Sequence, residues 1–136
     1  MENALIFLQE QFILVIPLVV LVFLLLRHES AKGGQKLSCA QLIQAANGDN
    51  AILLDVRDTA EFDEGHIVDA INMPHAKVAA SLQQLEKYRT KQVIVIDKLG
   101  QHSAAVVKTL AEKGFEAVRL GGGIAEWQQD NLPLVK

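Results

Sequence analysis

The stretch LLDVRDTAEFDEGHIVDAINMPH, residues 53–75, decides the fold. It overlaps ILLDV at 52–56, a short apolar run typical of strands that are buried on both faces of a parallel sheet. TAEFDEG at 59–65 is long enough for a single helical turn, and AINM at 70–73 predicts a second strand. Strands that alternate with helical segments favour an α/β domain.

The same alternation continues on both sides of this stretch. VIVID at 93–97 and AVRL at 117–120 predict two further strands. Helical patterns cover residues 39–46, 76–88, 103–115 and 123–129. With right-handed crossovers, this order predicts a central, mainly parallel sheet with helices on both faces.

The start of the domain is marked by a capping pattern. Ser38 and Gln41 have the spacing of a capping box, and Leu37 and Leu42 are placed as its hydrophobic staple. We therefore expect a helix to begin near Cys39, and the domain to cover residues 37–136.

A long apolar segment precedes the domain. FILVIPLVVLVFLLL at 12–26 has no polar side chain, and ALIFL at 4–8 extends its apolar character. The uninterrupted run is shorter than the roughly 20 residues that a bilayer crossing needs, so we expect a transmembrane helix over about 5–26. Residues 1–28 would then anchor the chain in the lipid bilayer, and residues 29–36 would form a flexible linker.

The charges around this segment predict its orientation. Arg27, Lys32 and Lys36 follow the apolar run and no Lys or Arg precedes it, which favours a single-pass anchor with a cytoplasmic C-terminal domain. A cleaved secretory signal is disfavoured, because its basic start and small-residue cleavage site are missing. A buried hairpin helix of a soluble protein remains the alternative interpretation.

Composition excludes several classes of function. Thirteen basic and sixteen acidic residues give a net charge of −3, with no basic cluster interleaved with aromatics, which argues against a nucleic-acid surface. The single cysteine, Cys39, excludes an intrachain disulfide and a cysteine-based metal site, and agrees with a reducing compartment. The sequence predicts neither a cofactor nor a metal.

Two motifs resemble signatures of rhodanese-like domains. Residues 53–75 are similar to the pattern in which D-V-R precedes E-[FY]-x-x-G-H-I and A-x-N-[IM]-P, and GFEAVRLGGGIAEW at 114–127 is similar to the closing motif that ends in Trp127. Rhodaneses hold a catalytic cysteine at the head of a loop C-x-x-G-x-[RT], where the thiolate takes up a sulfane sulfur. The positions that match this loop here are Asp97, Lys98, Leu99, Gly100, Gln101 and His102.

Aspartate therefore stands where the family has its catalytic cysteine. A carboxylate oxygen cannot replace a polarizable sulfur that both attacks and leaves, so we expect no catalytic residue in this loop. The amides of the loop and of the following helix are instead expected to bind the Asp97 carboxylate, and His102 to form a hydrogen-bonded pair with it.

The resemblance also assigns structural residues. Arg57, Glu61 and His66 are expected to tie the loop after residues 52–56 to the sheet, with Asp55 at the end of that strand. An N-terminal membrane helix, the missing cysteine and the ending NLPLV at 131–135 resemble the bacterial YibN-type family of membrane-anchored rhodanese-like proteins. This resemblance implies the inner (plasma) membrane.

The sequence thus predicts a catalytically inactive, membrane-anchored rhodanese-like domain that acts as a protein-interaction or regulatory module with an unidentified protein partner. Two enzymatic alternatives stay open. One is a sulfurtransferase that works through Cys39, whose place at a helix N-terminus would favour a thiolate. The other is a weak hydrolase that uses Asp97 and His102. Asp55, at the end of the neighbouring strand, would supply a further carboxylate if this end of the sheet formed a weak metal or phosphoryl site.

Overall fold

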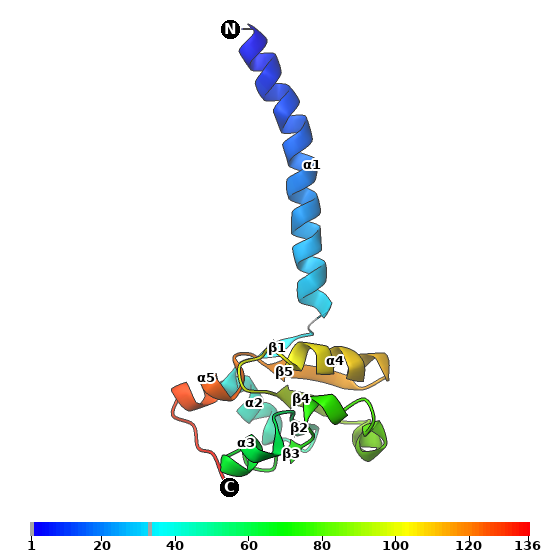
Figure 1. Ribbon diagram of the computed structural model, residues 1–136, viewed down its shortest axis with the longest axis vertical. Coiled ribbons are helices and arrows are strands. Elements are labelled where there is room, and N and C mark those ends of the chain that lie inside the picture. Colours follow the sequence, from blue (N-terminus) through cyan, green and yellow to red (C-terminus); the bar gives the residue numbers. More distant parts are fainter. Residues whose placement is uncertain (1, 33) are drawn as a thin grey trace. The chain divides into compact units, whose positions relative to one another are not determined.

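The chain forms two units (Figure 1). A computed structural model describes residues 2–32 and 34–136, and the side chains of all of these except 29–32. The first unit is a single helix, α1 (Glu2–Lys32), and the second is an α/β domain that contains every strand of the described chain.

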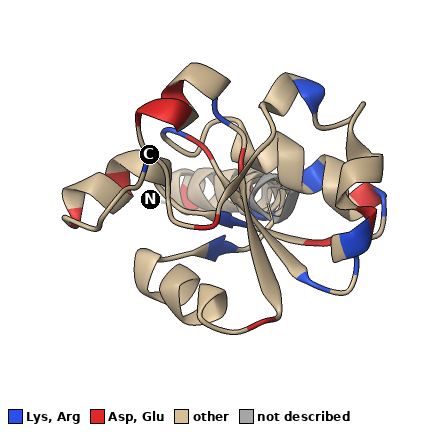
Figure 2. Cartoon of the chain, turned by 90° about the horizontal axis from the view of Figure 1, so that it is seen from below, with Lys and Arg blue, Asp and Glu red and all other residues tan. Residues whose placement is uncertain are grey.

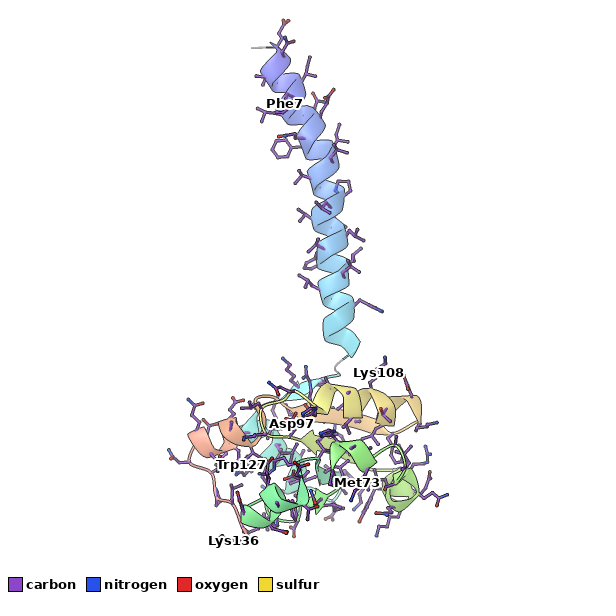
Figure 3. The ribbon with its side chains drawn as sticks, viewed as in Figure 1. Phe7, Met73, Asp97, Lys108, Trp127 and Lys136 are labelled. Carbon is purple, nitrogen blue, oxygen red and sulfur yellow. The ribbon has the colours of Figure 1, made fainter. Side chains whose placement is uncertain are left out.

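Helix α1 is long, apolar and exposed. Its stretch Glu2–His28 has 27 residues and a hydropathy of 2.4, and none of it is buried within the protein. At 1.5 Å per residue this stretch is about 40 Å long, which exceeds the roughly 30 Å of a bilayer's hydrocarbon core. Apolar side chains such as Phe7 project from the helix (Figure 3). The helix is therefore a candidate membrane span.

Helix α1 continues past the expected end of the anchor. The range 29–36, predicted as a flexible linker, overlaps helix α1 at residues 29–32 and strand β1 (Lys36–Leu37) at Lys36. RHESAK at 27–32 contains no glycine or proline, so nothing in it stops the helix before the glycine pair at 33–34. Residue 33 lies outside the described residues, and Gly34 has a φ of 72°.

The domain is built on a parallel sheet of five strands in the order β1-β5-β4-β2-β3. The other strands are β2 (Ala51–Asp55), β3 (Ile71–Asn72), β4 (Gln92–Ile96) and β5 (Glu116–Leu120). All four lie within one residue of the predicted runs. Strand β1 was not predicted, because two residues are too short to show a periodic pattern.

Helices connect the strands largely as predicted. They are α2 (Cys39–Ala46), α3 (Thr59–Glu64), α4 (Ser103–Glu112) and α5 (Gly123–Gln129). The capping box of α2 is present: the Gln41 N–H donates to the Ser38 hydroxyl at 3.2 Å, and the Ser38 N–H donates to the Gln41 side chain at 2.9 Å.

The prediction of one helix over 76–88 is wrong. Two short 3₁₀ segments, η1 (His75–Lys77) and η2 (Leu82–Tyr88), replace it. The chain leaves helical geometry at Ser81, with a φ of −114° and a ψ of 19°. Val78 and Leu85 are buried on either side of this break, so their packing against the sheet overrides the helix propensity of the sequence.

Side chains of successive residues in β4 enter two separate cores. Ile94 and Ile96 pack with residues of α2 and α5, whereas Val93 and Val95 pack with residues of α4 and η2. Helices thus cover both faces of the sheet, as predicted. Because all strands are parallel, their carboxyl ends share one edge, and ligand sites in such sheets lie at that edge.

Candidate functional site

The loop 97–102 leaves the carboxyl end of β4, the central strand, and leads into the N-terminus of α4. Asp97 stands at its head and is only 2% exposed. Figure 3 places this residue inside the α/β domain. Loop length and position agree with the six-residue loop that the sequence pattern predicts.

The Asp97 carboxylate is bound by the loop itself. The N–H of Gly100 donates to Oδ1, and the N–H groups of His102 and Ser103 donate to Oδ2 at 2.7 and 3.0 Å. Gly100 has a φ of 92°, a left-handed conformation that a side chain would disfavour, and it turns the loop back toward the carboxylate. Ser103 is the first residue of α4, where partial positive charge stabilises an anion.

The N-terminus of α5 also binds the loop, through hydrogen bonds to the main-chain carbonyls of its first two residues. The N–H of Ile124 in α5 donates to the Asp97 carbonyl at 2.8 Å, and the N–H of Ala125 donates to the Lys98 carbonyl at 3.0 Å. A Cβ on Gly123 would lie 2.7 Å from the Lys98 carbonyl oxygen, so only glycine allows this close approach. The sequence signal for this support is the GGG run at 121–123, whose role the sequence reasoning missed.

His102 does not form the expected side-chain pair with Asp97. Only its backbone N–H reaches the carboxylate, while its imidazole stacks on His75, with ring centroids 4.1 Å apart and planes inclined by 14°. Backbone N–H groups already donate hydrogen bonds to both carboxylate oxygens of Asp97, and the His102 imidazole packs against another residue instead. His75 was missed because it is remote in sequence from the loop and follows Pro74, the last residue that the A-x-N-[IM]-P pattern specifies.

Arg57 and Asp55 form a buried ion pair beside the loop. The Arg57 Nη2 lies 2.8 Å from one Asp55 carboxylate oxygen, its Nε lies 3.0 and 3.1 Å from the two oxygens, and Nη2 also donates to the Gly65 carbonyl at 2.7 Å. Asp55 has no exposed surface. The pair therefore joins the end of β2 to the turn after α3.

The other motif residues, His66, Trp127 and Glu61, have different surroundings. The His66 Nδ1 lies 2.9 Å from the Phe62 carbonyl oxygen, and its ring stacks on Phe62. The Trp127 Nε1 donates to the Pro133 carbonyl at 3.0 Å. Glu61 is half-buried and lines the cavity beside the loop.

A small cavity of about 140 Å³ opens beside the loop. Its lining combines the loop side chains of Asp97, Lys98, Leu99, Gln101 and His102 with Val56, Arg57, Asp58, Glu61 and His75. Charges of both signs are distributed over the domain (Figure 2). Within residues 2–32 and 34–136, no three His, Cys, Asp or Glu side chains gather into a metal site.

Cys39 lies elsewhere, in the core between the sheet and helices α2 and α5, where it is 5% exposed. It does not line the cavity beside the loop. Burial raises the pKa of its thiol, and the carboxylates of Asp130 and Glu126 raise that pKa further. The thiol form is therefore favoured over the reactive thiolate, contrary to the effect expected from its place at the start of a helix.

Comparison with known proteins agrees with this geometry. The sequence model of the family described as Rhodanese-like domain matches residues 38–130. The chain is 36% identical over 92 residues to the protein YibN of Escherichia coli (strain K12), which covers 66% of this chain and 64% of YibN. The match thus spans slightly less than two thirds of YibN.

Two other similar proteins extend the comparison. Over 96 residues the chain is 31% identical to the thiosulfate sulfurtransferase GlpE of Shewanella oneidensis, covering 70% of this chain and 93% of GlpE. The crystal structure of a rhodanese-related protein from Thermoplasma volcanium matches with a TM-score of 0.68 and 32% identity, covering 74% of this chain and 97% of that one. By motif, loop geometry and sequence match, the chain belongs to the rhodanese-like domain family.

Proposed function

We propose that this rhodanese-like domain is catalytically inactive and acts as a protein-interaction or regulatory module, held by α1 at the cytoplasmic face of the inner (plasma) membrane. One observation carries the proposal: the Asp97 carboxylate fills the cradle of backbone N–H groups at the head of the loop. The cradle is satisfied without a substrate.

The chemistry of sulfur transfer supports this interpretation. A sulfurtransferase thiolate attacks a sulfane sulfur, forms a persulfide, and then gives up the outer sulfur to an acceptor. The carboxylate oxygen of Asp97 supplies neither the polarizable nucleophile nor the exchangeable sulfur. Its hydrogen bonds to three amides further stabilise it in place.

The sulfurtransferase alternative requires Cys39. That thiol is buried, has a raised pKa and does not line the cavity beside the loop, which are the opposite of the properties that make a cysteine reactive. The test is a thiosulfate-to-cyanide assay on the full chain in detergent micelles, with Cys39→Ala as the matched variant. We expect no turnover above a protein-free blank. Turnover that Cys39→Ala abolishes would overturn the proposal.

The hydrolase alternative has less structural support. It needs the His102 imidazole beside Asp97, but that ring stacks on His75. It also needs Asp55 as a second free carboxylate, but Asp55 is buried and paired with Arg57. Both partners that would activate Asp97 are therefore engaged elsewhere.

The membrane location is supported by the length and apolarity of α1 and by the basic residues that follow its apolar run. Protease accessibility tests the orientation. In inverted inner-membrane vesicles an added protease should degrade the domain, whereas in intact spheroplasts the domain should survive. The reverse pattern would place the domain outside.

A partner is sought by photo-crosslinking in native membranes. Leu99 is 53% exposed at the rim of the loop cavity and is a suitable position for a photoreactive residue. We expect a discrete crosslinked protein of the same mass in independent preparations. Crosslinks to lipid alone would argue against a protein partner at this rim.

A further inference from the structure

The largest cavity described in the domain is a groove of about 670 Å³ that shares no lining residue with the cavity beside the loop. Its walls come from α2, the start of β2, the segment 67–71 and the C-terminal segment 132–135. We call it the α2 groove. None of the residues assigned above to the loop 97–102 contributes to it.

The floor of the α2 groove is the edge of strand β2, and part of this edge has no neighbouring strand among the described residues. Strand β4 pairs with all five residues of β2, whereas β3 pairs only with Leu54 and Asp55. Within the described chain, Ala51, Ile52 and Leu53 therefore have a strand partner on one side only, and all three line the groove. Asp69, two residues before β3 begins, has a left-handed backbone conformation with a φ of 65°.

The main-chain groups of β2 show which residues face the open side. The Asn50 carbonyl accepts from the Gln92 N–H on the β4 side at 2.8 Å, and the Asp55 carbonyl accepts from the Met73 N–H on the β3 side at 2.9 Å. Peptide groups alternate in direction along a strand, so Ala51 and Leu53 share the direction of Asp55. The N–H groups of Ala51 and Leu53 therefore point to the β3 side of β2, at a level where β3 does not extend.

Exposed apolar residues gather around the same groove. Outside α1, the large hydrophobic residues of the described chain that are exposed are Ile43, Val68, Leu99 and Val135. Ile43, Val68 and Val135 all line the α2 groove, and Val68 is 58% exposed. An apolar rim above an open strand edge is the combination that strand-adding peptides use.

The charges of the lining narrow the occupant further. Asp49 and Asp69 are exposed carboxylates, whereas Lys91, the basic residue of the lining, is half-buried. Charge complementarity therefore favours an occupant with at least one Lys or Arg.

We infer that the α2 groove binds an extended segment of a partner protein, which adds as a strand beside residues 51–53, places apolar side chains against Ile43, Val68 and Val135, and sets a basic residue near Asp49 or Asp69. This inference rests on the proposed role as an interaction module and names the surface and the partner chemistry for it. Main-chain pairing supplies affinity, and alternate side chains supply specificity.

The test selects peptides from a phage-displayed library of random short peptides against the full chain in nanodiscs of phosphatidylcholine. An enriched peptide is synthesised, and its affinity is measured by fluorescence anisotropy for the unmodified chain, Val68→Asp and the control Gln129→Asp, since Gln129 is exposed in α5 and lines neither the groove nor the cavity beside the loop. We expect binding about tenfold weaker or worse for Val68→Asp and unchanged for Gln129→Asp. Amide exchange at Ala51 and Leu53 should slow on binding.

Several results would overturn the inference: no peptide enriched, equal losses in both variants, no loss in Val68→Asp, or no added protection at Ala51 and Leu53. Binding of oleate that Val68→Asp abolishes, with no peptide enriched, would replace the peptide by an acyl chain and also overturn it. Failure here leaves the sulfur-transfer assay unaffected, so the inference and the proposed inactivity fail separately.

Discussion

The carboxylate of Asp97 accepts a 3.0 Å hydrogen bond from the backbone N–H of Ser103, the first residue of α4. A fixed anion therefore occupies the helix N-terminus at which an active rhodanese loop presents its nucleophile. The same carboxylate also fixes the loop through Gly100 and His102. Asp97 is in this account a structural residue, and its replacement should change stability rather than remove an activity.

Asp97→Ala should destabilise the domain by about 2–4 kcal/mol, because backbone N–H groups that are buried with it lose a charged acceptor. The free energy of unfolding is measurable by urea titration of the full chain in micelles, followed by the fluorescence of its one tryptophan, Trp127. Asp58→Ala is the control, since Asp58 lines the same cavity but makes no capping hydrogen bond. Equal effects of the two substitutions would remove the structural role of Asp97.

Gly123→Ala should weaken the support behind the loop. Gly123 has a φ of 62°, and an added Cβ would lie 2.7 Å from the Lys98 carbonyl oxygen, so we expect a loss of about 2 kcal/mol or more. Gly48→Ala is the matched control, because a Cβ there meets its nearest atom, the Ala45 carbonyl oxygen, at 3.6 Å. A harmless Gly123→Ala would mean that α5 does not hold the loop.

Arg57→Ala should cost about 3–5 kcal/mol of unfolding free energy, since it leaves the Asp55 carboxylate buried without its ion-pair partner. The exposed pair of Arg89 and Glu86 offers a contrast, because solvent screens it, and Glu86→Ala should cost much less unfolding free energy than Arg57→Ala. A double substitution of Asp55 and Arg57 by alanine should cost less than the sum of the single changes. Strict additivity would show that the two side chains do not interact.

The raised pKa of Cys39 predicts a dependence of stability on alkaline pH. Burial disfavours the thiolate in the folded chain, so the unfolded chain loses its proton at lower pH. The resulting stabilisation is complete below the ordinary cysteine pKa of about 8.5, and it is lost as pH rises from there through the raised pKa of the folded state. Above this pH the unmodified chain should therefore lose unfolding free energy relative to Cys39→Ala. A constant difference would contradict the shifted pKa.

Sequence patterns predicted the framework of the domain because its signals are local. The strands of the sheet other than β1 are short apolar runs, and the capping box of α2 is defined by two residues three positions apart. The identity of the residue at the head of the loop also followed from the motif alone. Each of these features depends on neighbours in the chain.

The features that sequence missed depend on tertiary contacts. Val78 and Leu85 pack against the sheet and break the helix expected over 76–88, although their segment is rich in helix formers. The stacking of His102 on His75 joins residues that are far apart in the chain. The α2 groove likewise arises because β3 pairs with only part of β2, a register that no local pattern encodes.

The most direct test of the account is to return a thiol to the head of the loop. Asp97→Cys and the unmodified full chain are each incubated with thiosulfate, and sulfur uptake is read by intact-protein mass spectrometry before and after cyanide. We predict that Asp97→Cys gains one sulfur atom that cyanide removes, while the unmodified chain gains none. Uptake by the unmodified chain, or an inert thiol in Asp97→Cys, would contradict the claim that Asp97 alone occupies an otherwise intact cradle.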